Sequence, residues 1–458
     1  MFRFSGFYMI KWLLAWRYFF KRPISILAVV AVALCVFIVL VVMTVMNGLL
    51  RDFKQKNHNY AGDCIIASDS LVGFGYYEDF TSILEEQPYI EAVSPMAKGV
   101  GLVHLKQYKW DSGIEIHGID PLLHSRVTSF ADTLHYQKQT PEDAFRPQYA
   151  PQSDGCITGI ELIPLGRRKT DGTYLYHDKP MRMELVISAF PLNIKGGLLR
   201  SLDLVSTKSF YYSDDSHSGL VKVDGAVVYI PLEQAQILCG MDSPIKRISS
   251  LHIRFADGES VQSSVAKVRR LWDEFVAQNI NKPGGSLFSN VRVQSWQQNR
   301  RSVIAPMEKE QIMMTMLFLM LGVITVFIVF VVLYMIISHK SKDIGILKSM
   351  GVSMSSILGI FLLFSIFIAS TGSLVGSVLG WIFLYKINDL EDWLYKNHNW
   401  QLWDRTVYAI GDIPNQVAPE VLAIIVGSAV FACMIGALVP GLQAARKKPV
   451  QSLQVNQL

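Results

Sequence analysis

Four long stretches of this sequence contain no charged residue, and they restrict the fold more than any other feature. They run from Ile26 to Met46, from Gln311 to Ser338, from Ser349 to Tyr385 and from Val421 to Ala445. A helix needs about 20 apolar residues to cross a hydrocarbon core about 30 Å thick, and it satisfies its own backbone hydrogen bonds in lipid. The sequence therefore predicts a membrane protein with four transmembrane α-helices and excludes a wholly soluble protein.

The first stretch could also be the apolar core of a secretory signal peptide. Such a core has about 7–15 residues and precedes an Ala-x-Ala cleavage site. Here the apolar run is longer, and it continues as Met46-Asn47-Gly48-Leu49 without that site. We therefore expect a transmembrane helix over residues 24–50, followed by further spans at 311–338, 354–385 and 421–445.

Basic residues predict the orientation of these spans, because cytoplasmic flanks are enriched in Lys and Arg. The regions 1–23, 339–353 and 446–458 are strongly basic, whereas segments 51–310 and 386–420 carry a net negative charge. Both termini are therefore expected in the cytoplasm and segment 51–310 outside. The formal net charge of +5 follows from this topology and gives no reason to expect nucleic acid as a partner. The aromatic segment 7–20 is expected to be a helix in the inner interface, or else a simple extension of span one.

Segment 51–310 is long enough to fold as a separate domain. Apolar runs predict strands at Asp63–Ala67, Val100–Leu105, Gly113–His117, Met183–Ser188, Gly225–Ile230 and Ser250–Phe255, and helical spacing predicts helices at Glu78–Gln87 and Val261–Gln278. The polar stretches Tyr136–Tyr149 and Gly166–Pro180 are expected to be loops. We therefore expect a large α+β domain between spans one and two. It holds Cys64, Cys156 and Cys239, an odd number whose pairing the sequence cannot decide.

No catalytic, metal or nucleotide motif is apparent. The sequence has no G-x-x-x-x-G-K-[ST], H-E-x-x-H, C-x-x-C or G-x-S-x-G, and its ten histidines show no spacing typical of metal ligands. The interiors of the spans hold no Asp, Glu, Lys, Arg or His, which argues against an ion-coupled transporter. We therefore expect a non-enzymatic protein without a cofactor or metal of its own.

The short loop after span two is the most informative segment. It reads His339-Lys-Ser-Lys-Asp-Ile-Gly-Ile-Leu-Lys-Ser-Met-Gly351, in which Ile344, Leu347 and Met350 recur every three residues. This spacing predicts a short amphipathic helix that Gly351 ends. The helix either rests on lipid headgroups or docks into a groove of a cytoplasmic partner. Span three contains Gly372, Gly376 and Gly380 at intervals of four residues. Such spacing would permit close contact between helices at a dimer seam. The alternative is that these are ordinary glycines of a membrane helix.

Two segments carry a family resemblance. Lys342–Gly351 resembles the inner loop of MacB/FtsX-type ABC-transporter permeases, and Pro440–Leu453 is similar to their C-terminal signature. The likeness is greatest to the lipoprotein-releasing permeases of the LolC/LolE type. It is carried by Val45-Met-Asn-Gly48, Gly118-Ile-Asp-Pro121, Val228–Gln236, and Ser295-Trp-Gln-Gln-Asn-Arg300 with Met307-Glu-Lys-Glu310; the charged stretch Leu162–Pro180 departs from the pattern.

The resemblance implies a four-helix permease with a MacB-like periplasmic domain in the cell inner membrane. It implies a dimer with a second copy or a related subunit, two LolD-like ATPase subunits that bind the ATP, acylated lipoprotein cargo and a LolA-like periplasmic carrier. The ATPase-coupling residues would be Lys342, Asp343, Ile344, Gly345, Ile346, Leu347, Lys348, Met350 and Gly351, and a carrier-binding hairpin would use Phe190, Leu192, Leu198 and Leu199.

On this reading, ATP hydrolysis by the partner would move the periplasmic domain and release the cargo. Acyl chains would lie against Met43, Met46, Leu49, Met313 and Met316, which are expected to line a lipid-open cavity between spans one and two. Two alternatives remain. One is an FtsX-like regulator that moves an extracytoplasmic partner without transporting lipid, and the other is a MacB-like export pump.

Overall fold

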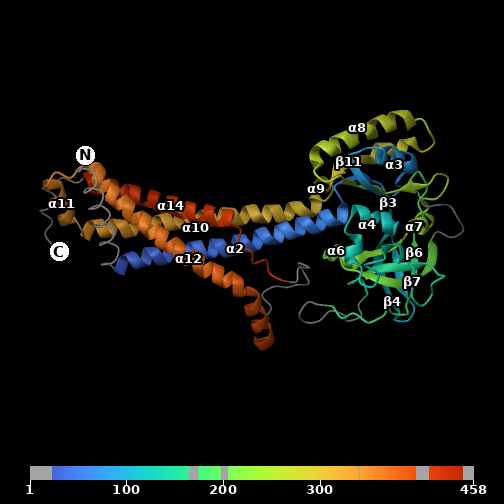
Figure 1. Cartoon of the computed structure of the whole chain (residues 1–458), viewed down its shortest axis with the longest axis horizontal. Coiled ribbons are helices and arrows are strands. Elements are labelled where there is room, and N and C mark those ends of the chain that lie inside the picture. Colours follow the sequence, from blue (N-terminus) through green and yellow to red (C-terminus); the bar gives the residue numbers. More distant parts are fainter. Residues whose placement is uncertain (1–22, 164–173, 198–204, 340, 399–411, 447–458) are drawn as a thin grey trace. The chain divides into compact units, whose positions relative to one another are not determined.

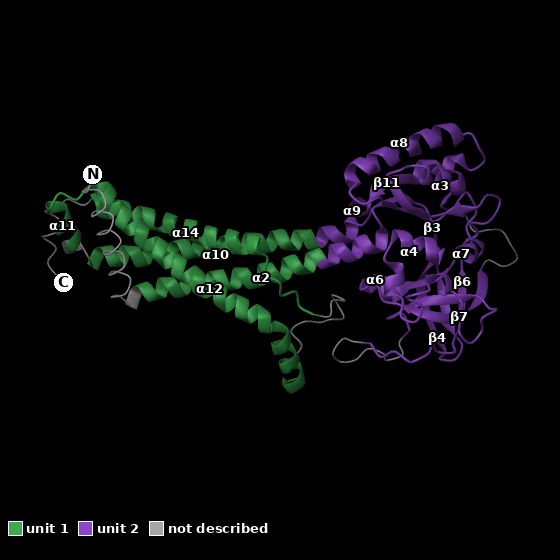
Figure 2. Cartoon of the chain, viewed as in Figure 1, with its two compact units in different colours: residues 1–51, 307–403, 412–458 green, residues 52–306, 404–411 purple. Residues whose placement is uncertain are grey.

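The computed structural model describes residues 23–163, 174–197, 205–339, 341–398 and 412–446. The chain divides into two compact units, drawn in different colours in Figure 2. We call residues 1–51, 307–403 and 412–458 the helical unit, and residues 52–306 and 404–411 the sheet unit. The expected interfacial helix at 7–20 and almost all of the C-terminal tail lie outside the described residues.

Four helices are long and apolar enough to cross a membrane, as predicted. They are α2 (Pro23–Ala61), α10 (Arg301–His339), α12 (Met354–His398) and α14 (Pro419–Arg446), labelled in Figure 1. Each continues beyond its charge-free stretch, because polar residues at the ends also favour helix. The last turns of α2, from Asp52, and the first turns of α10, up to Pro306, belong to the sheet unit. Both helices therefore have residues in both units.

The three spaced glycines of α12 pack within the chain. An added Cβ at Gly372 would lie 2.8 Å from Cβ of Val32, and one at Gly376 would run into the carbonyl oxygen of Ala33. Gly380 approaches Leu40 in the same way. Lipid gives little hydrophobic drive for helix association, so close van der Waals contact of this kind holds spans together. The glycine spacing therefore forms a seam between α12 and α2.

The sheet unit is built on a nine-stranded sheet with the order β11-β1-β10-β3-β4-β8-β5-β7-β6. Because β3 also pairs with β6, the strands from β3 to β6 close into a ring. Successive parts of one edge of β3 pair with β10 and β6, and its other edge pairs with β4. The bounds are β1 Cys64–Ser68, β3 Ile90–Leu105, β4 Trp110–Ile119, β5 Gly155–Gly159, β6 Glu184–Ala189, β7 Ser206–Ser216, β8 Val227–Pro231, β10 Ser250–Phe255 and β11 Val291–Ser295; β2 (Phe74–Gly75) and β9 (Arg247–Ile248) form a separate pair.

Helices cover this sheet. The larger ones are α3 (Tyr77–Glu85), α7 (Leu232–Cys239) and α8 (Val261–Asn279), and the short ones are α4 (Pro121–Val127), α5 (Phe130–Thr133), α6 (Val221–Ala226) and α9 (Trp296–Asn299), with 3₁₀ turns η1 (Pro141–Asp143) and η2 (Gly285–Asn290). An aromatic core of Phe80, Trp272, Phe275 and Phe288 joins α3, α8 and η2. The predicted α+β class is confirmed, as are the six expected strands and both expected helices.

The sequence prediction missed β5, β7 and β11. Strand β7 is polar, and its Asp214 and Asp215 are buried. The carboxylate of Asp214 accepts hydrogen bonds from the backbone N–H groups of His135, Tyr136 and Gln137. Burial raises the pKa of Asp214 to about 6, against these hydrogen bonds. The five cysteines are all described, and each is free.

Three histidines lie buried between the sheet and its covering helices: His117 on β4, His124 on α4 and His252 on β10. His117 is held at a ring nitrogen by the Tyr60 hydroxyl at 3.2 Å, and His124 by the Ser94 hydroxyl at 3.2 Å. His252 is held at both ring nitrogens, by the carbonyl oxygen of Ala61 at 2.8 Å and by the Ser250 hydroxyl at 3.1 Å. Burial lowers the pKa of His117 to about 4 and that of His252 to about 3, and it lowers the pKa of His124 well below its ordinary value. All three rings are therefore neutral at pH 7.

We expect the sheet unit to lose stability on mild acidification. An unfolded histidine binds a proton below its ordinary pKa of 6.5, whereas folded His117 resists protonation down to about pH 4. Neutral His117 should therefore make its full contribution to the free energy of unfolding above pH 6.5. This contribution should fall as the pH drops toward 4, by up to about 3 kcal/mol. Hydrogen exchange of β4 and β10 in the detergent-solubilised chain measures this. His117→Gln should flatten the slope, and His104→Gln, at an exposed site, should leave it unchanged.

The seam between α12 and α2 gives a second prediction. Gly376→Ala should lower the free energy of unfolding of the helical unit by about 1–3 kcal/mol, because the new methyl group meets backbone that cannot move aside. Gly427→Ala in α14 is the matched control, since nothing lies within 4 Å of its added Cβ. Unfolding of both variants in mixed micelles compares them. Equal stability of the two variants would contradict the seam.

Candidate functional site

The predicted inner-loop helix is present as α11 (Ser341–Ser349), followed by Gly351 at φ +89°. Its apolar residues divide between two roles. Ile344 is 4% exposed and belongs to the core of the helical unit, whereas Ile346 is 50% exposed and Met350 is 76% exposed. Leu347 is half-buried, Gly345 is buried and the side chain of Lys342 is not described. The exposed apolar pair is thus Ile346 and Met350, one helical turn apart.

Polar contacts fix α11 against the end of α14. The ammonium group of Lys348 donates to the carbonyl oxygen of Ala445 at 2.8 Å. This contact satisfies one of the C-terminal carbonyls that a helix leaves unpaired, and it places a cation at the negative end of the helix dipole. With Ile344 in the core and Lys348 on α14, helix α11 is held from one side. Its other side, with Ile346 and Met350, remains available to a partner.

The methionines expected to meet acyl chains lie on two helices. Met313 and Met316 of α10 are 64% and 63% exposed, and Met320, which the sequence analysis did not single out, continues the same exposed face one turn later. On α2, Met43 and Met46 are half-buried. Leu49 is buried and therefore cannot line an open cavity in this structure. We call Met313, Met316 and Met320 the methionine row.

The Met-Asn-Gly pattern lies where three segments of the helical unit meet. The Nε2 of Gln311 on α10 donates to Oδ1 of Asn47 on α2 at 2.6 Å. The next residue, Gly48, leaves room for the ring of Pro414. Segment 412–414 is in turn bound to α12, because the amide of Asn388 makes hydrogen bonds to both the N–H and the C=O of Ile413. Asn47 therefore binds α10 through its side-chain amide, and Gly48 admits Pro414 because it has no side chain.

The Trp-x-x-x-Arg pattern grips the last turns of α2 within the sheet unit. Trp296 packs its ring on that of His58, with centroids 4.9 Å apart, and donates its backbone N–H to the carbonyl oxygen of Asp63. Four residues later, the guanidinium of Arg300 lies 4.6 Å from the ring centroid of Tyr60. Residues four apart share one helical face, so both can meet α2. We call these two contacts the α2 clamp.

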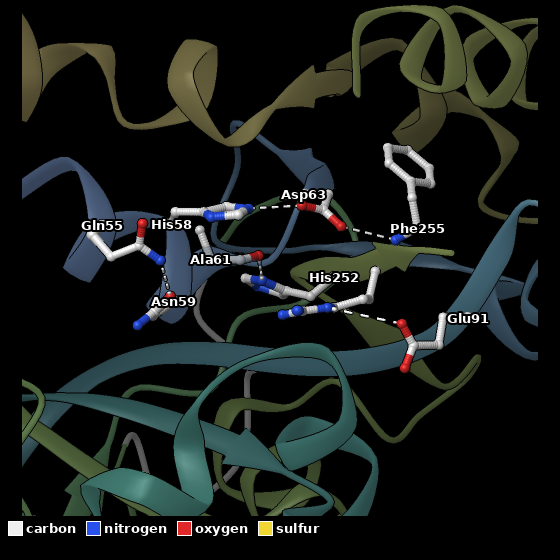
Figure 3. A network of polar contacts seen from close by, with 9 residues as sticks. Gln55, His58, Asn59, Ala61, Asp63, Glu91, His252 and Phe255 are labelled. Carbon is white, nitrogen blue, oxygen red and sulfur yellow. Dashed lines mark hydrogen bonds and ion pairs between the residues drawn. The ribbon is translucent and has the colours of Figure 1, made fainter. Parts of the chain in front are cut away.

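Asp63, two residues after the end of α2, contacts both His58 and Phe255, as Figure 3 shows. Its Oδ1 lies 2.7 Å from Nε2 of His58, and its Oδ2 accepts from the N–H of Phe255 at 2.8 Å. Burial opposes ionisation of this carboxyl, but the hydrogen bonds from His58 and Phe255 prevail and hold the pKa of Asp63 below its usual value. The carboxylate therefore joins the end of α2 to strand β10 at neutral pH.

The segment expected to bind a carrier is only partly described. Phe190 is exposed and Leu192 is half-buried, while Leu198 and Leu199 lie outside the described residues. The buried guanidinium of Arg247 donates to the carbonyl oxygens of Val72, Leu192 and Gly240. Arg247 thus anchors the start of this segment, a role the sequence alone did not reveal. In the part of the chain that is described, no three His, Cys, Asp or Glu residues are grouped to hold a metal.

Comparisons with known proteins agree with this architecture. Residues 315–449 match the family described as FtsX-like permease C-terminal. The chain is 21% identical over 441 residues to the lipoprotein-releasing system transmembrane protein LolC of Neisseria meningitidis serogroup B, with 95% of each chain covered. It is 19% identical over 433 residues to the protein of the same name from Xylella fastidiosa strain 9a5c, with 94% of each covered.

Among solved structures, the periplasmic region of MacB from Actinobacillus actinomycetemcomitans matches with a TM-score of 0.30 at 13% identity, covering 54% of this chain and 95% of that one. The extracellular domain of the transporter YknZ matches with a TM-score of 0.29 at 12% identity, covering 46% of this chain and 94% of that one. The family match covers the last three apolar helices and the loop that carries α11. Residues 315–449 therefore match an FtsX-like permease C-terminal domain, in a chain whose described part holds four helices that could cross a membrane.

Proposed function

We propose that this permease extracts acylated lipoproteins from the outer leaflet of the cell inner membrane and passes them to a LolA-like periplasmic carrier. The observation that carries this proposal is the exposed methionine row on α10, in a chain similar over almost its whole length to proteins named for lipoprotein release. Helix α2 adds the half-buried Met43 and Met46. Methionine adapts to apolar groups of varied shape, which suits a site for several acyl chains.

The energy for extraction comes from outside this chain. Each CH₂ pulled out of the bilayer costs about 0.8 kcal/mol, so several acyl chains are too costly to release spontaneously on a useful timescale. The sequence holds no phosphate-binding loop. The permease family implies a separate ATPase, and we assign it as a LolD-like pair bound to a dimer of this chain with a second copy or a related subunit.

Helix α11 receives the movement of that ATPase. Ile346 and Met350 supply an exposed apolar pair, and Ile344 and Lys348 pass a displacement to the core of the helical unit and to α14. This assignment requires α11 and both termini in the cytoplasm and the sheet unit in the periplasm. The α2 clamp then ties the last turns of α2 to α9 and to Arg300, which directly precedes α10.

Cargo capture tests the proposal. A photo-crosslinking residue at Met316 should capture an acylated lipoprotein in membranes that contain the partner ATPase, and ATP turnover should release the captured species. The same probe at Leu374, an equally exposed position on α12, should capture mainly phospholipid. If Met316 never captures an acylated protein, the chain acts as an FtsX-like regulator instead; preferential capture of unacylated peptides would favour a MacB-like pump.

The docking role of α11 gives a separate prediction. Ile346→Asp combined with Met350→Asp should reduce co-purification of the ATPase, and ATP-driven cargo release, by at least about tenfold, because two apolar contacts are replaced by charges at an interface core. Ser349→Asp, which is also exposed on α11, is the matched control and should have little effect. Aspartate at Ile344 is unsuitable, because it would be placed in the core. Unchanged release by the double variant would exclude this face as the docking site.

A further inference from the structure

The amides of Asn47 and Gln311 retain hydrogen-bonding capacity after they bind each other. The bond runs from Nε2 of Gln311 to Oδ1 of Asn47. Among the described residues, neither Nδ2 of Asn47 nor Oε1 of Gln311 has a further hydrogen-bond partner, and neither atom is among the enclosed unpaired polar atoms. Both side chains are half-buried. The pair thus offers one free donor and one free acceptor, side by side on two helices.

Their position in the sequence gives the depth of the pair. Asn47 directly follows the apolar stretch Ile26–Met46, and Gln311 is the first residue of the next one. The pair therefore marks the boundary between hydrocarbon and interface, where the ester groups of a lipid lie. The methionines continue from it into the hydrocarbon, Met46 and Met43 along α2 and the methionine row along α10.

Resting on the proposed function, we infer that Asn47 and Gln311 form a subsite for the linkage region of an acylated cysteine, whose ester carbonyls accept from Asn47 and whose amide N–H donates to Gln311. The acyl chains then lie along the methionines. A diacyl phospholipid has ester carbonyls but no amide N–H in this region, so it satisfies Asn47 and leaves the oxygen of Gln311 unpaired. The additional hydrogen bond to Gln311 therefore favours the acylated cysteine over the phospholipid.

The test uses the full chain in nanodiscs with two fluorescent probes of equal chain length, an S-diacylglyceryl, N-acyl cysteinyl peptide and a diacyl phospholipid. Wild-type protein should prefer the lipopeptide. Gln311→Leu should reduce this preference about five- to tenfold, the loss expected for one hydrogen bond. Asn47→Leu should weaken both probes alike. Thr315→Val, one turn along α10, is the control and should leave both affinities unchanged.

The outcomes separate this inference from the proposed function. If wild-type protein binds neither probe above a chain-length-matched background, lipoprotein release itself is excluded. If it binds both probes equally, or if Gln311→Leu keeps the full preference, the subsite is wrong while the proposed function stands. If Gln311→Leu weakens both probes equally and lowers the melting temperature, the pair is only a tie between α2 and α10, which also overturns the inference.

Discussion

Close packing of α12 against α2 is the constraint on which the helical unit depends. In lipid, apolar side chains gain nothing by leaving water, so spans associate through contact area and a few polar bonds. Gly372, Gly376 and Gly380 remove side chains along one line of α12 and let the backbone of α2 approach. Because this seam occupies one side of α2, other positions on the same helix remain for Gln311 of α10 and for Pro414.

Two short sequence patterns contact α2, one in each unit. In the helical unit, Asn47 of α2 is hydrogen-bonded to Gln311 of α10. In the sheet unit, the α2 clamp joins α2 to Trp296 of α9 and to Arg300, the residue before α10. The two patterns therefore link α2 to the chain segment that contains or directly precedes α10.

The sequence predicted those parts of the fold whose pattern is local. Spans, strands and amphipathic helices each repeat with their own period, and all four spans and six strands were found. The buried strand β5 was missed, and β7 was missed because its buried Asp214 is satisfied by the backbone of residues 135–137, far away in the sequence. The helix α11 was predicted, but its exposed face only in part. The three-residue repeat included the exposed Met350 but also selected Ile344, which lies in the core of the helical unit, and it passed over Ile346. Leu49 and Arg247 show the same limit, since only tertiary contacts decide their burial.

An extraction machine in a bilayer faces a selection problem that apolar contacts cannot solve. Acyl chains are the same in a phospholipid and in a lipoprotein, and the phospholipids are far more numerous. Under the proposed function, the methionine row would bind chains of either kind, because dispersion contacts do not distinguish what the chain is attached to. Discrimination would then come from polar groups at the depth where the attachment chemistry begins. Asn47 and Gln311 lie at that boundary, and among the described residues they keep a donor and an acceptor unused. They are therefore the groups of α2 and α10 through which we propose that selection acts.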